Sequence, residues 1–446
     1  MTPPLFALEG LKTHLLEQSR ACRRPPVDRF AHPWLSPMPL SASGAAHLAF
    51  RAGEDKAKAH VPSLAQHHQG DGFSAGDYSL GLFHHDVSEA AIELLRYEEF
   101  HDVVAGSLLN LLDAASPDGC VHRAELPHKS REAEPAKPVM AQFALRVVQA
   151  LGAAGPDWAA RHRVFERTAR FIGYLEKNHV GLHGLFLTHS SLQTGFDSDI
   201  LSAGFADKTV EGPDTNAFMV LEYRALAALA GLLGDAPCEA RLVEKAEVLR
   251  ARIEQLLWFE DDSGGRYTAL RWQHGVASLE AERVGRRLPD GRTEPYESWV
   301  SLLPLYANIP SPPRAAVLIR KLLHPGSYWG PQGVRTTPAD DLYFHQAPRV
   351  LHFDFKKMGR GPVSNWSGPV WTLSNFYLAR GLRQYGAVAA ADELCRKTLR
   401  LLADGLAAQG MLHECYDDAG RGLWPRSGTF ISWNVLALTL QRDAGA

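Results

Sequence analysis

A recurring unit constrains the fold of this 446-residue chain more than any other feature. Five times, an apolar helix-like stretch ends, a glycine-containing turn follows, and a short polar segment comes next. The glycines that mark these turns are Gly119, Gly184, Gly265, Gly333 and Gly410. They are separated by 65, 81, 68 and 77 residues, a mean of about 73, which is room for two helices and their connections. The chain therefore holds about six such units, with the weakest pattern at the N-terminus.

Apolar residues recur at three- and four-residue spacings over long stretches, as they do in helices that bury one face. Several of these stretches begin at Pro or Asp and end near Gly, which are common helix-capping residues. We expect helices over residues 87–116, 138–155, 158–179, 214–234, 238–258, 312–324, 368–386, 387–410 and 429–443.

Helical hairpins repeated at this length predict an all-α fold, an (α/α)6 barrel with short β segments in the loops at one end. An open α-solenoid has the same periodicity. The polar segments favour the barrel, because a closed ring brings them together at one end of a cavity. We expect residues 1–446 to form a single catalytic domain, with residues 54–77 and 259–298 as long loops or insertions. The second of these stretches is expected to contain a short hairpin.

Composition and charge narrow the class of partner. The net charge of −3 provides no basic field for a polyanion, so we expect no nucleic-acid partner. The sequence has no stretch of about 18 uncharged apolar residues, so we expect no membrane span. We also expect no secretory signal, because the N-terminus lacks its pattern. The five cysteines are scattered, without CxxC pairs, which predicts reduced thiols and no zinc site. We expect a cytoplasmic protein without a metal or other cofactor; the sequence leaves the oligomeric state open.

Two acidic residues stand out in the polar segments. Asp197 lies in SLQTGFDSDILSAG (191–204), and Glu414 lies in LHECYDD. They are 217 residues apart, about three units, which places them on opposite sides of the cavity of a six-unit ring. Two carboxyl groups across a cavity are the minimum requirement for glycosidic hydrolysis: one protonates the leaving oxygen and the other activates water. With 50 acidic residues in the chain, this pairing alone is a weak signal.

Six motifs in the same order strengthen the hypothesis. The chain resembles the glycoside hydrolase clan of family 63 α-glucosidases and family 37 trehalases, which includes bacterial mannosylglycerate and glucosylglycerate hydrolases. The resemblance covers about residues 77 to 440. Its motifs are KPVMAQFALRVV (137–148), TGFDSDIL, DTNAFMVLEYRALA (214–227), ESWVSLLPLYANI (297–309), SGPVWTLSNFYLARGLRQYG (367–386) and LHECYDDAGRG. TGFDSDIL is similar to the clan's SGWDNSPR segment, and LHECYDDAGRG is similar to its HENYNPETGEG segment.

The resemblance implies roles for the two carboxyl groups. Asp197 takes the position of the general acid and Glu414 that of the general base. The clan is inverting, which requires roughly 6.5–9.5 Å between the carboxyl groups. Asp197 would need a raised pKa, which partial burial beside Phe196 could supply. The expected substrate is a small α-glucoside or α-mannoside, cleaved from its non-reducing end; trehalose or a sugar–glycerate conjugate are the alternatives within the clan.

The resemblance also implies residues that bind the sugar. Asp86, in GLFHHDVSEA, is similar to the Asp of the clan's FWDSAF segment; the alternatives are a helix N-cap or, with His84 and His85, a metal ligand, although adjacent side chains rarely converge on one ion. Asp214 lies at a helix start, where it either contacts sugar or caps the helix. The other candidates are three tryptophans that could stack on a pyranose or pack in the core, and three residues of a loop expected to face the sugar. These are Trp366, Trp371, Trp433, Gln332, Arg335 and Asp340.

The chain departs from the clan's motifs at three places. The Arg of WDNSPR is absent, Ser367 replaces the Arg of RGPVW, and HHD replaces FWD. These groups contact the sugar and what lies beyond it, so the resemblance predicts fold and reaction better than substrate. A glycerate carboxylate would require a positive group nearby, for which Arg335 and Arg426 are candidates.

Two other functions remain open from the sequence. A sugar epimerase of the acylglucosamine type uses the same barrel but places facing histidines at its centre, and this chain has 20 histidines. A non-catalytic α-solenoid or carbohydrate-binding scaffold would have an open ring or a filled cavity.

Overall fold

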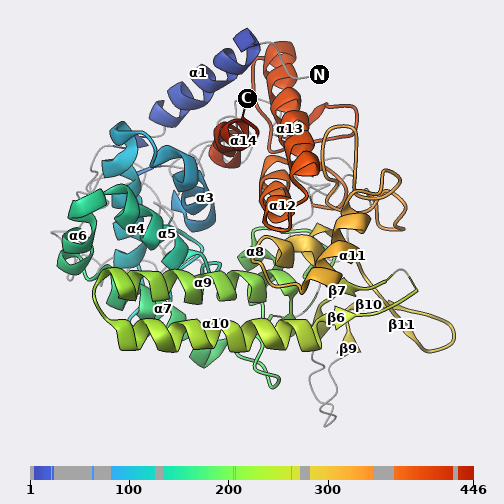
Figure 1. Cartoon of the computed structure of the whole chain (residues 1–446), viewed down its shortest axis with the longest axis horizontal. Helices are drawn as coiled ribbons and strands as arrows, with labels where there is room; N and C mark the ends of the chain where they lie inside the picture. The colour runs from blue at the N-terminus through green and yellow to red at the C-terminus, as the bar shows by residue number, and fades with distance from the viewer. Residues whose placement is uncertain are drawn as a thin grey trace, which may run out of the picture.

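The computed structural model describes residues 5–21, 23–24, 63–64, 82–125, 134–203, 205, 207–262, 264–271, 282–345, 366–424 and 430–445. These residues are mostly helical, which confirms the predicted all-α class (Figure 1). The α-helices are α1 (Leu5–Ala21), α3 (His84–Leu94), α4 (His101–Asp113), α5 (Met140–Ala150), α6 (Gly155–Arg161), α7 (Val164–Asn178), α8 (Ser191–Thr194), α9 (Pro213–Leu232), α10 (Ala236–Leu256), α11 (Pro312–Leu322), α12 (Thr372–Gln384), α13 (Val388–Gln409) and α14 (Ala437–Asp443). The 3₁₀ segments are η2 (Glu98–Phe100), η3 (Gly152–Ala154), η4 (Trp299–Leu305) and η5 (Ser432–Leu436).

Short antiparallel strands occupy the connections, as the sequence predicts. They are β1 (Arg23–Arg24), β2 (Ser63–Leu64), β3 (Leu82–Phe83), β4 (Ala124–Glu125), β5 (Val210–Glu211), β6 (Trp258–Phe259), β7 (Arg266–Tyr267), β8 (Leu270–Arg271), β9 (Glu282–Arg283), β10 (Gly285–Arg287), β11 (Thr293–Pro295), β12 (Val370–Trp371), β13 (Cys415–Tyr416) and β14 (Gly422–Trp424). They form the pairs β1–β2, β3–β4, β6–β7 and β10–β11 and the triplets β5–β8–β9 and β12–β13–β14. The described part of 259–298 thus holds more strand than the single hairpin predicted, while most of 54–77 lies outside the described residues.

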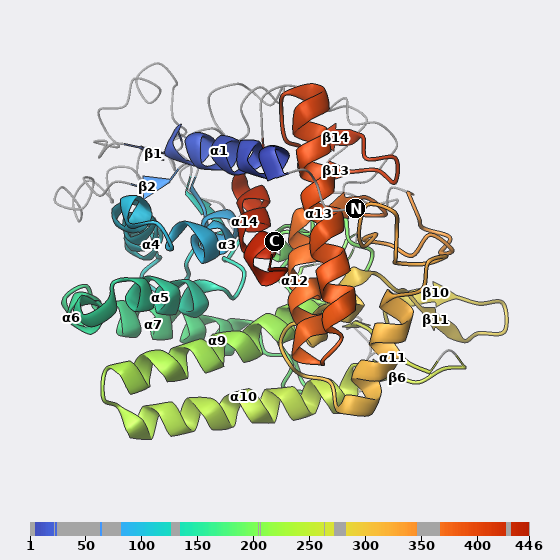
Figure 2. The same ribbon diagram turned by 45° about the horizontal axis from the view of Figure 1, so that its top comes forward.

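Six elements contact one another in chain order: α3, α5, α9, η4, α12 and η5, and η5 in turn contacts α3. A second helix packs against each of them: α4 against α3, α7 against α5, α10 against α9, α11 against η4, α13 against α12, and α1 against both η5 and α13. Figure 1 shows α9 and α10 side by side, and Figures 1 and 2 both show α1 next to the C-terminal α13. The first helix of the chain thus packs against the last elements.

Burial patterns follow this pairing. α10 buries a stripe at three- and four-residue spacing, formed by Leu242, Ala246, Leu249 and Ile253, as expected of a helix with one solvent face. Its partner α9 is buried almost all round, which is typical of a helix enclosed by others. The main hydrophobic cluster runs from Leu8 to Leu440 and includes residues of both helices, so the paired elements share one core.

Several predicted helix boundaries were wrong. The helix predicted over 87–116 is divided into α3 and α4, because Tyr97 between them adopts an extended backbone and its hydroxyl donates to Glu93. The helix predicted over 158–179 is divided at Arg163, which has a left-handed φ of 52°. The helix predicted from residue 368 begins four residues later, because Val370 and Trp371 pair with β13 instead.

Two helical segments have weak sequence signals. The N-terminal α1 was not predicted, because the pattern of this region is the weakest in the chain. The segment η4 contains Pro304, which has no backbone N–H to donate in a helix interior, and it adopts a 3₁₀ rather than an α conformation.

Among the described residues, no helix is both long and apolar enough to cross a membrane.

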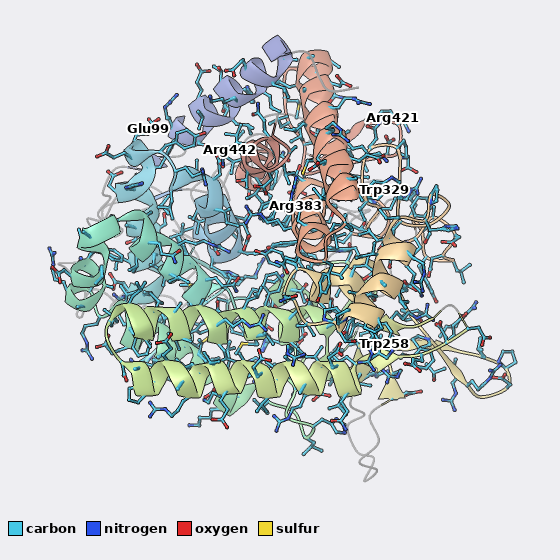
Figure 3. All side chains as sticks on the ribbon, in the orientation of Figure 1. Glu99, Trp258, Trp329, Arg383, Arg421 and Arg442 are labelled. Carbon is cyan, nitrogen blue, oxygen red and sulfur yellow. The ribbon has the colours of Figure 1, made fainter. Side chains whose placement is uncertain are left out.

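A buried carboxylate joins α14, which follows η5 in the chain, to α3, the first of the six elements. Glu93 of α3 is fully buried and accepts hydrogen bonds from Thr439 Oγ1 at 2.8 Å and from Arg442 Nη1 at 2.9 Å, both on α14. Arg442, labelled in Figure 3, also donates to Glu93 through Nη2. Because Tyr97 donates to the same carboxylate at 3.0 Å, three side chains compensate the burial of one charge.

We expect Glu93→Gln to lower the free energy of unfolding by about 2–4 kcal/mol, because its amide hydrogens would face donors in a buried site. Urea denaturation measures the change. The matched control is Glu294→Gln, which breaks the Arg286–Glu294 ion pair, whose side chains are each nearly half exposed. Because solvent screens this pair, we expect no resolvable change in the free energy of unfolding. Equal losses in the two variants would contradict a special role for the α3–α14 contact.

Candidate active site

The first turn of α3 is fixed by a neutral histidine. His84 is 1% exposed; its Nδ1 lies 2.6 Å from the Arg123 carbonyl, and its Nε2 lies 2.6 Å from the Lys137 backbone nitrogen. The imidazole therefore donates at Nδ1 and accepts at Nε2. Burial lowers the pKa of His84 to about 3, which agrees with an uncharged ring.

Asp86 lies in the same turn, and its side chain contacts η5 near the C-terminus. It is 9% exposed, and Oδ1 accepts a 2.6 Å hydrogen bond from the hydroxyl of Ser432 in η5. The N-cap of α3 is Phe83, so the alternative that Asp86 caps this helix is wrong. Asp86 instead lies in the first turn, where a negative charge is favourable to the helix dipole.

The loop that carries Asp197 is held on both sides. Before it, Gly195 has a φ of 72°, and a Cβ there would lie 2.5 Å from His85 Nδ1, so both the turn and the close approach require glycine. After it, Ser198 Oγ accepts from the Trp366 backbone N–H at 3.0 Å, and the Ser198 carbonyl accepts from Ser367 Oγ at 3.1 Å. Asp197 itself is partly buried. The loop thus has little freedom to move relative to Trp366.

A cluster of aromatic rings lies against this loop. Phe196 is fully buried and contacts His85, Trp299 and Trp366. Trp366 stacks on Trp371 with ring centroids 3.9 Å apart and planes 9° apart, and Trp371 contacts Trp433 at 5.4 Å.

The three tryptophans predicted as sugar platforms all belong to this cluster. Trp366 and Trp371 are 1% and 2% exposed, and Trp433 is 7% exposed. A ring that binds a pyranose needs an accessible face. The burial favours the core-packing alternative for the first two residues, and a sugar contact stays a prediction for all three.

Glu414 lies directly before β13 and is 7% exposed. Its neighbours are fixed: Trp371 pairs with Cys415 in the β12–β13 ladder, and the His413 backbone N–H donates to the Tyr416 hydroxyl at 2.9 Å. Asn434 of η5 donates to the His413 carbonyl at 2.8 Å and accepts from Thr372 at 2.6 Å. Glu414 is therefore a buried carboxyl on a restrained turn and not a solvated loop charge.

One chain of contacts connects the segments that carry Asp197 and Glu414. It runs from Ser198 to the backbone of Trp366, through the stacked ring of Trp371, and across the strand pair to Cys415. Asp86 joins the same assembly through Ser432, because the neighbouring Trp433 contacts His85 and Trp371. Segments of α3, the 194–199 loop, β12, β13 and η5 are thus brought together.

The loop that carries Gln332, Arg335 and Asp340 borders this assembly through the bridge between Arg335 and Val370. Arg335 is 8% exposed; its Nε lies 2.9 Å from an oxygen of Asp418, and its Nη1 donates to the carbonyls of Pro325 and Ser327. Gln332 is partly buried and Asp340 is exposed. These bonds give Arg335 a structural role, and contact of any of the three with sugar stays a prediction.

Asp214 lies in the first turn of α9 and is 3% exposed. Burial raises the pKa of Asp214, while the Lys137 ammonium and the backbone N–H of Thr215 lower it. Backbone N–H groups of Thr215 and of Asp214 itself interact with this carboxyl in the first turn, although the N-cap of α9 is Gly212 and not Asp214. Contact with sugar stays a prediction here also.

The sequence analysis missed a group of buried charges beneath these loops. Lys137 is 1% exposed, and burial lowers its pKa to about 7. Asp199 is 1% exposed; burial raises its pKa to about 7, and Oδ2 has no hydrogen-bond partner among the described residues. Glu89 is also 1% exposed, and burial raises its pKa. The only signal in the sequence is that Lys137 and Asp199 stand inside the motifs KPVMAQFALRVV and TGFDSDIL.

The alternative that His84, His85 and Asp86 bind a metal finds no support in this geometry. Both nitrogens of His84 are used in bonds to the backbone, and His85 faces aromatic rings and Tyr377. Among the described residues, no group of three or more His, Cys, Asp or Glu side chains could hold a metal ion.

Curated relatives match part of the chain. A mannosylglycerate hydrolase of Rubrobacter radiotolerans is 29% identical over 226 residues, which are 50% of this chain and 41% of that protein. A mannosylglycerate hydrolase of Thermus thermophilus is 28% identical over 224 residues, 49% of this chain and 42% of that protein. The matched segment thus spans about two fifths of each of these relatives.

Solved structures share the fold over more of the chain. A GH63 mannosylglycerate hydrolase of Thermus thermophilus in complex with Tris and D-glycerate has a TM-score of 0.61 at 17% identity, covering 97% of this chain and 99% of that one. A structure of the Thermus thermophilus enzyme in complex with glucose has a TM-score of 0.59 at 20% identity, covering 90% and 99%. The neutral trehalase Nth1 of Saccharomyces cerevisiae has a TM-score of 0.61 at 14% identity, covering 86% and 73%.

Residues 83–433 match the sequence profile of the mannosylglycerate hydrolase MGH1-like glycoside hydrolase domain. The match begins at the strand before α3 and ends in η5, so it includes every segment of the assembly described above. With the trehalase and GH63 folds, it confirms the resemblance to the clan of family 63 and family 37 enzymes. The chain belongs to the family of the MGH1-like glycoside hydrolase domain.

Proposed function

We propose that this protein is an inverting, exo-acting glycoside hydrolase built on an (α/α)6 barrel, with Asp197 as general acid and Glu414 as general base. The observation that carries the proposal is that two buried or partly buried carboxyl groups, 217 residues apart in the chain, lie on loops fixed to the same Trp366–Trp371 stack. The contacts of α3, α5, α9, η4, α12 and η5 in a closed order support the barrel.

The reaction is a single displacement. The Asp197 carboxylic acid donates its proton to the glycosidic oxygen as the bond from that oxygen to the anomeric carbon breaks. The Glu414 carboxylate removes a proton from water, whose oxygen attacks the anomeric carbon from the opposite face. The products are the free sugar with inverted configuration and the protonated leaving group. The proposal requires roughly 6.5–9.5 Å between the two carboxyl groups, enough to hold that water.

The proposed substrates are small α-mannosides or α-glucosides, with sugar–glycerate conjugates tested first because the curated relatives are mannosylglycerate hydrolases. Arg335 is a weak candidate for binding the glycerate carboxylate, since Asp418 and two carbonyls already accept its hydrogen bonds. Arg426, the other candidate, lies outside the described residues. A panel of mannosylglycerate, glucosylglycerate, trehalose and α-linked disaccharides, with release of the monosaccharide as the readout, tests the proposal.

The buried histidines argue against the epimerase alternative. An epimerase needs imidazoles that exchange protons with the sugar. His84 is held neutral by two backbone bonds, and burial lowers the pKa of His85 well below its usual value. The hydrolase is therefore the better proposal for these segments.

We expect Asp197→Asn and Glu414→Gln each to lower kcat by at least about 10²-fold, because each removes one proton transfer of the displacement. Initial rates on the best substrate of the panel measure the loss. Circular dichroism spectra and melting temperatures serve as the control for folding. Near-normal kcat in either variant would remove that residue from its assigned role.

Stereochemistry gives an independent test. An α-linked substrate should release the β-anomer first, because water attacks opposite the leaving group. Proton NMR in the first minutes of hydrolysis, before mutarotation, distinguishes the anomers. Release of the α-anomer would show a retaining reaction and would make Glu414 a nucleophile instead of a base.

A further inference from the structure

We infer that Lys137 is a positioning residue, whose ammonium group clamps the loop 194–199 and so fixes the carboxyl of Asp197. The inference rests on the proposed function for the role of Asp197, but the clamp itself is a property of the fold. Lys137 precedes α5 and reaches this loop across the interior, beneath the segments that form the candidate site.

The contacts of Lys137 lie on both sides of the turn at Gly195. Its Nζ donates a 2.6 Å hydrogen bond to the carbonyl of Thr194, at the end of α8. The same atom lies 3.6 Å from the ring centroid of Phe196 and 4.2 Å from that of Phe218 on α9. One ammonium therefore joins the residue before the turn, the residue that precedes Asp197, and a helix of the core.

Packing alone does not explain a lysine at this place. A fully buried ammonium loses its hydration, which is costly unless bonds and charges compensate for it. A methionine would fill the same volume without that cost. The hydrogen bond to a neutral carbonyl and the two aromatic faces are interactions that specifically use the cation.

Titratable groups on several elements face Lys137. They are His84, His85 and Glu89 on α3, Asp214 on α9 and Asp199 on the loop itself. The three carboxyl groups raise the pKa of Lys137, but burial dominates and lowers it to about 7. Because deprotonation removes the cation–π contacts, the clamp is strongest below neutral pH and weakens as the pH rises through about 7.

Bonds that do not involve Lys137 also hold the other half of the loop. Ser198 is held by Trp366 and Ser367, and Asp199 Oδ1 accepts from Ser298 Oγ at 3.0 Å. Loss of the clamp should therefore misplace Asp197 without unfolding the loop. A displacement of about 1 Å at a reacting group can cost on the order of 10²-fold in rate.

The test compares Lys137→Met with wild type and with Lys321→Met as matched control. Lys321 is 16% exposed, and its ammonium lies 3.4 Å from Glu297, outside the candidate site. We expect Lys137→Met to lower kcat about 10- to 100-fold at pH 6 while KM changes less than about threefold. Methionine cannot be deprotonated, so the variant should lack the loss of rate that deprotonation of Lys137 causes in wild type. The alkaline limb of its pH–rate profile should therefore lie at higher pH than that of wild type. Lys321→Met should match wild type in both measurements.

Hydrogen exchange supplies a readout that does not need a substrate. At pH 6, amides of residues 195–197 should exchange at least about tenfold faster in Lys137→Met than in wild type, with the amides of α9 unchanged. If wild type hydrolyses no sugar of the panel, the proposed function fails while the exchange data still test the clamp. If wild type is active and Lys137→Met keeps both its kcat and its slow exchange, the inference is wrong.

Discussion

The stack of Trp366 on Trp371 is the contact on which the candidate site depends. The backbone N–H of Trp366 donates to Ser198, next to Asp197, and Trp371 pairs with Cys415, next to Glu414. Both neighbouring residues are thus bound to one of the two stacked tryptophans. Stacked indoles bury large apolar surfaces and tolerate little displacement in a close-packed interior. The backbone segments that carry the two carboxyl groups are therefore both anchored to rigid side chains.

The contact between α3 and the C-terminal elements is made at two places along α3. Asp86 binds Ser432 at one of them, and two turns further along Glu93 binds Thr439 and Arg442. Buried polar bonds of this kind specify one arrangement of the elements, because any other leaves a carboxylate unpaired. The same contact brings α3, which carries Asp86, beside the segment of Trp433. Packing of the C-terminal elements and the position of the candidate site are thus coupled through α3.

Much of this organisation could be predicted from the sequence, because it depends on local patterns. Apolar periodicity predicted α9, α10 and α13 to within a few residues. What could not be predicted depends on contacts between remote residues. The left-handed φ of Arg163 has no local signal, and the burial of Lys137 and Asp199 exists only once α9 and the 194–199 loop are packed together. A lone lysine in a polar segment is otherwise read as solvated.

The departures from the clan's motifs acquire a physical meaning in this fold. Ser367, which stands where the clan has Arg, is 2% exposed and donates to the Ser198 carbonyl. Leu201, at the position of the missing Arg of WDNSPR, is buried, and its backbone N–H binds Asp199. Both positions thus stabilise the Asp197 loop from within the protein. In this chain neither of these two positions carries a charged side chain, and both Asp197 and Glu414 are retained. The two differences therefore leave the proposed proton transfers in place.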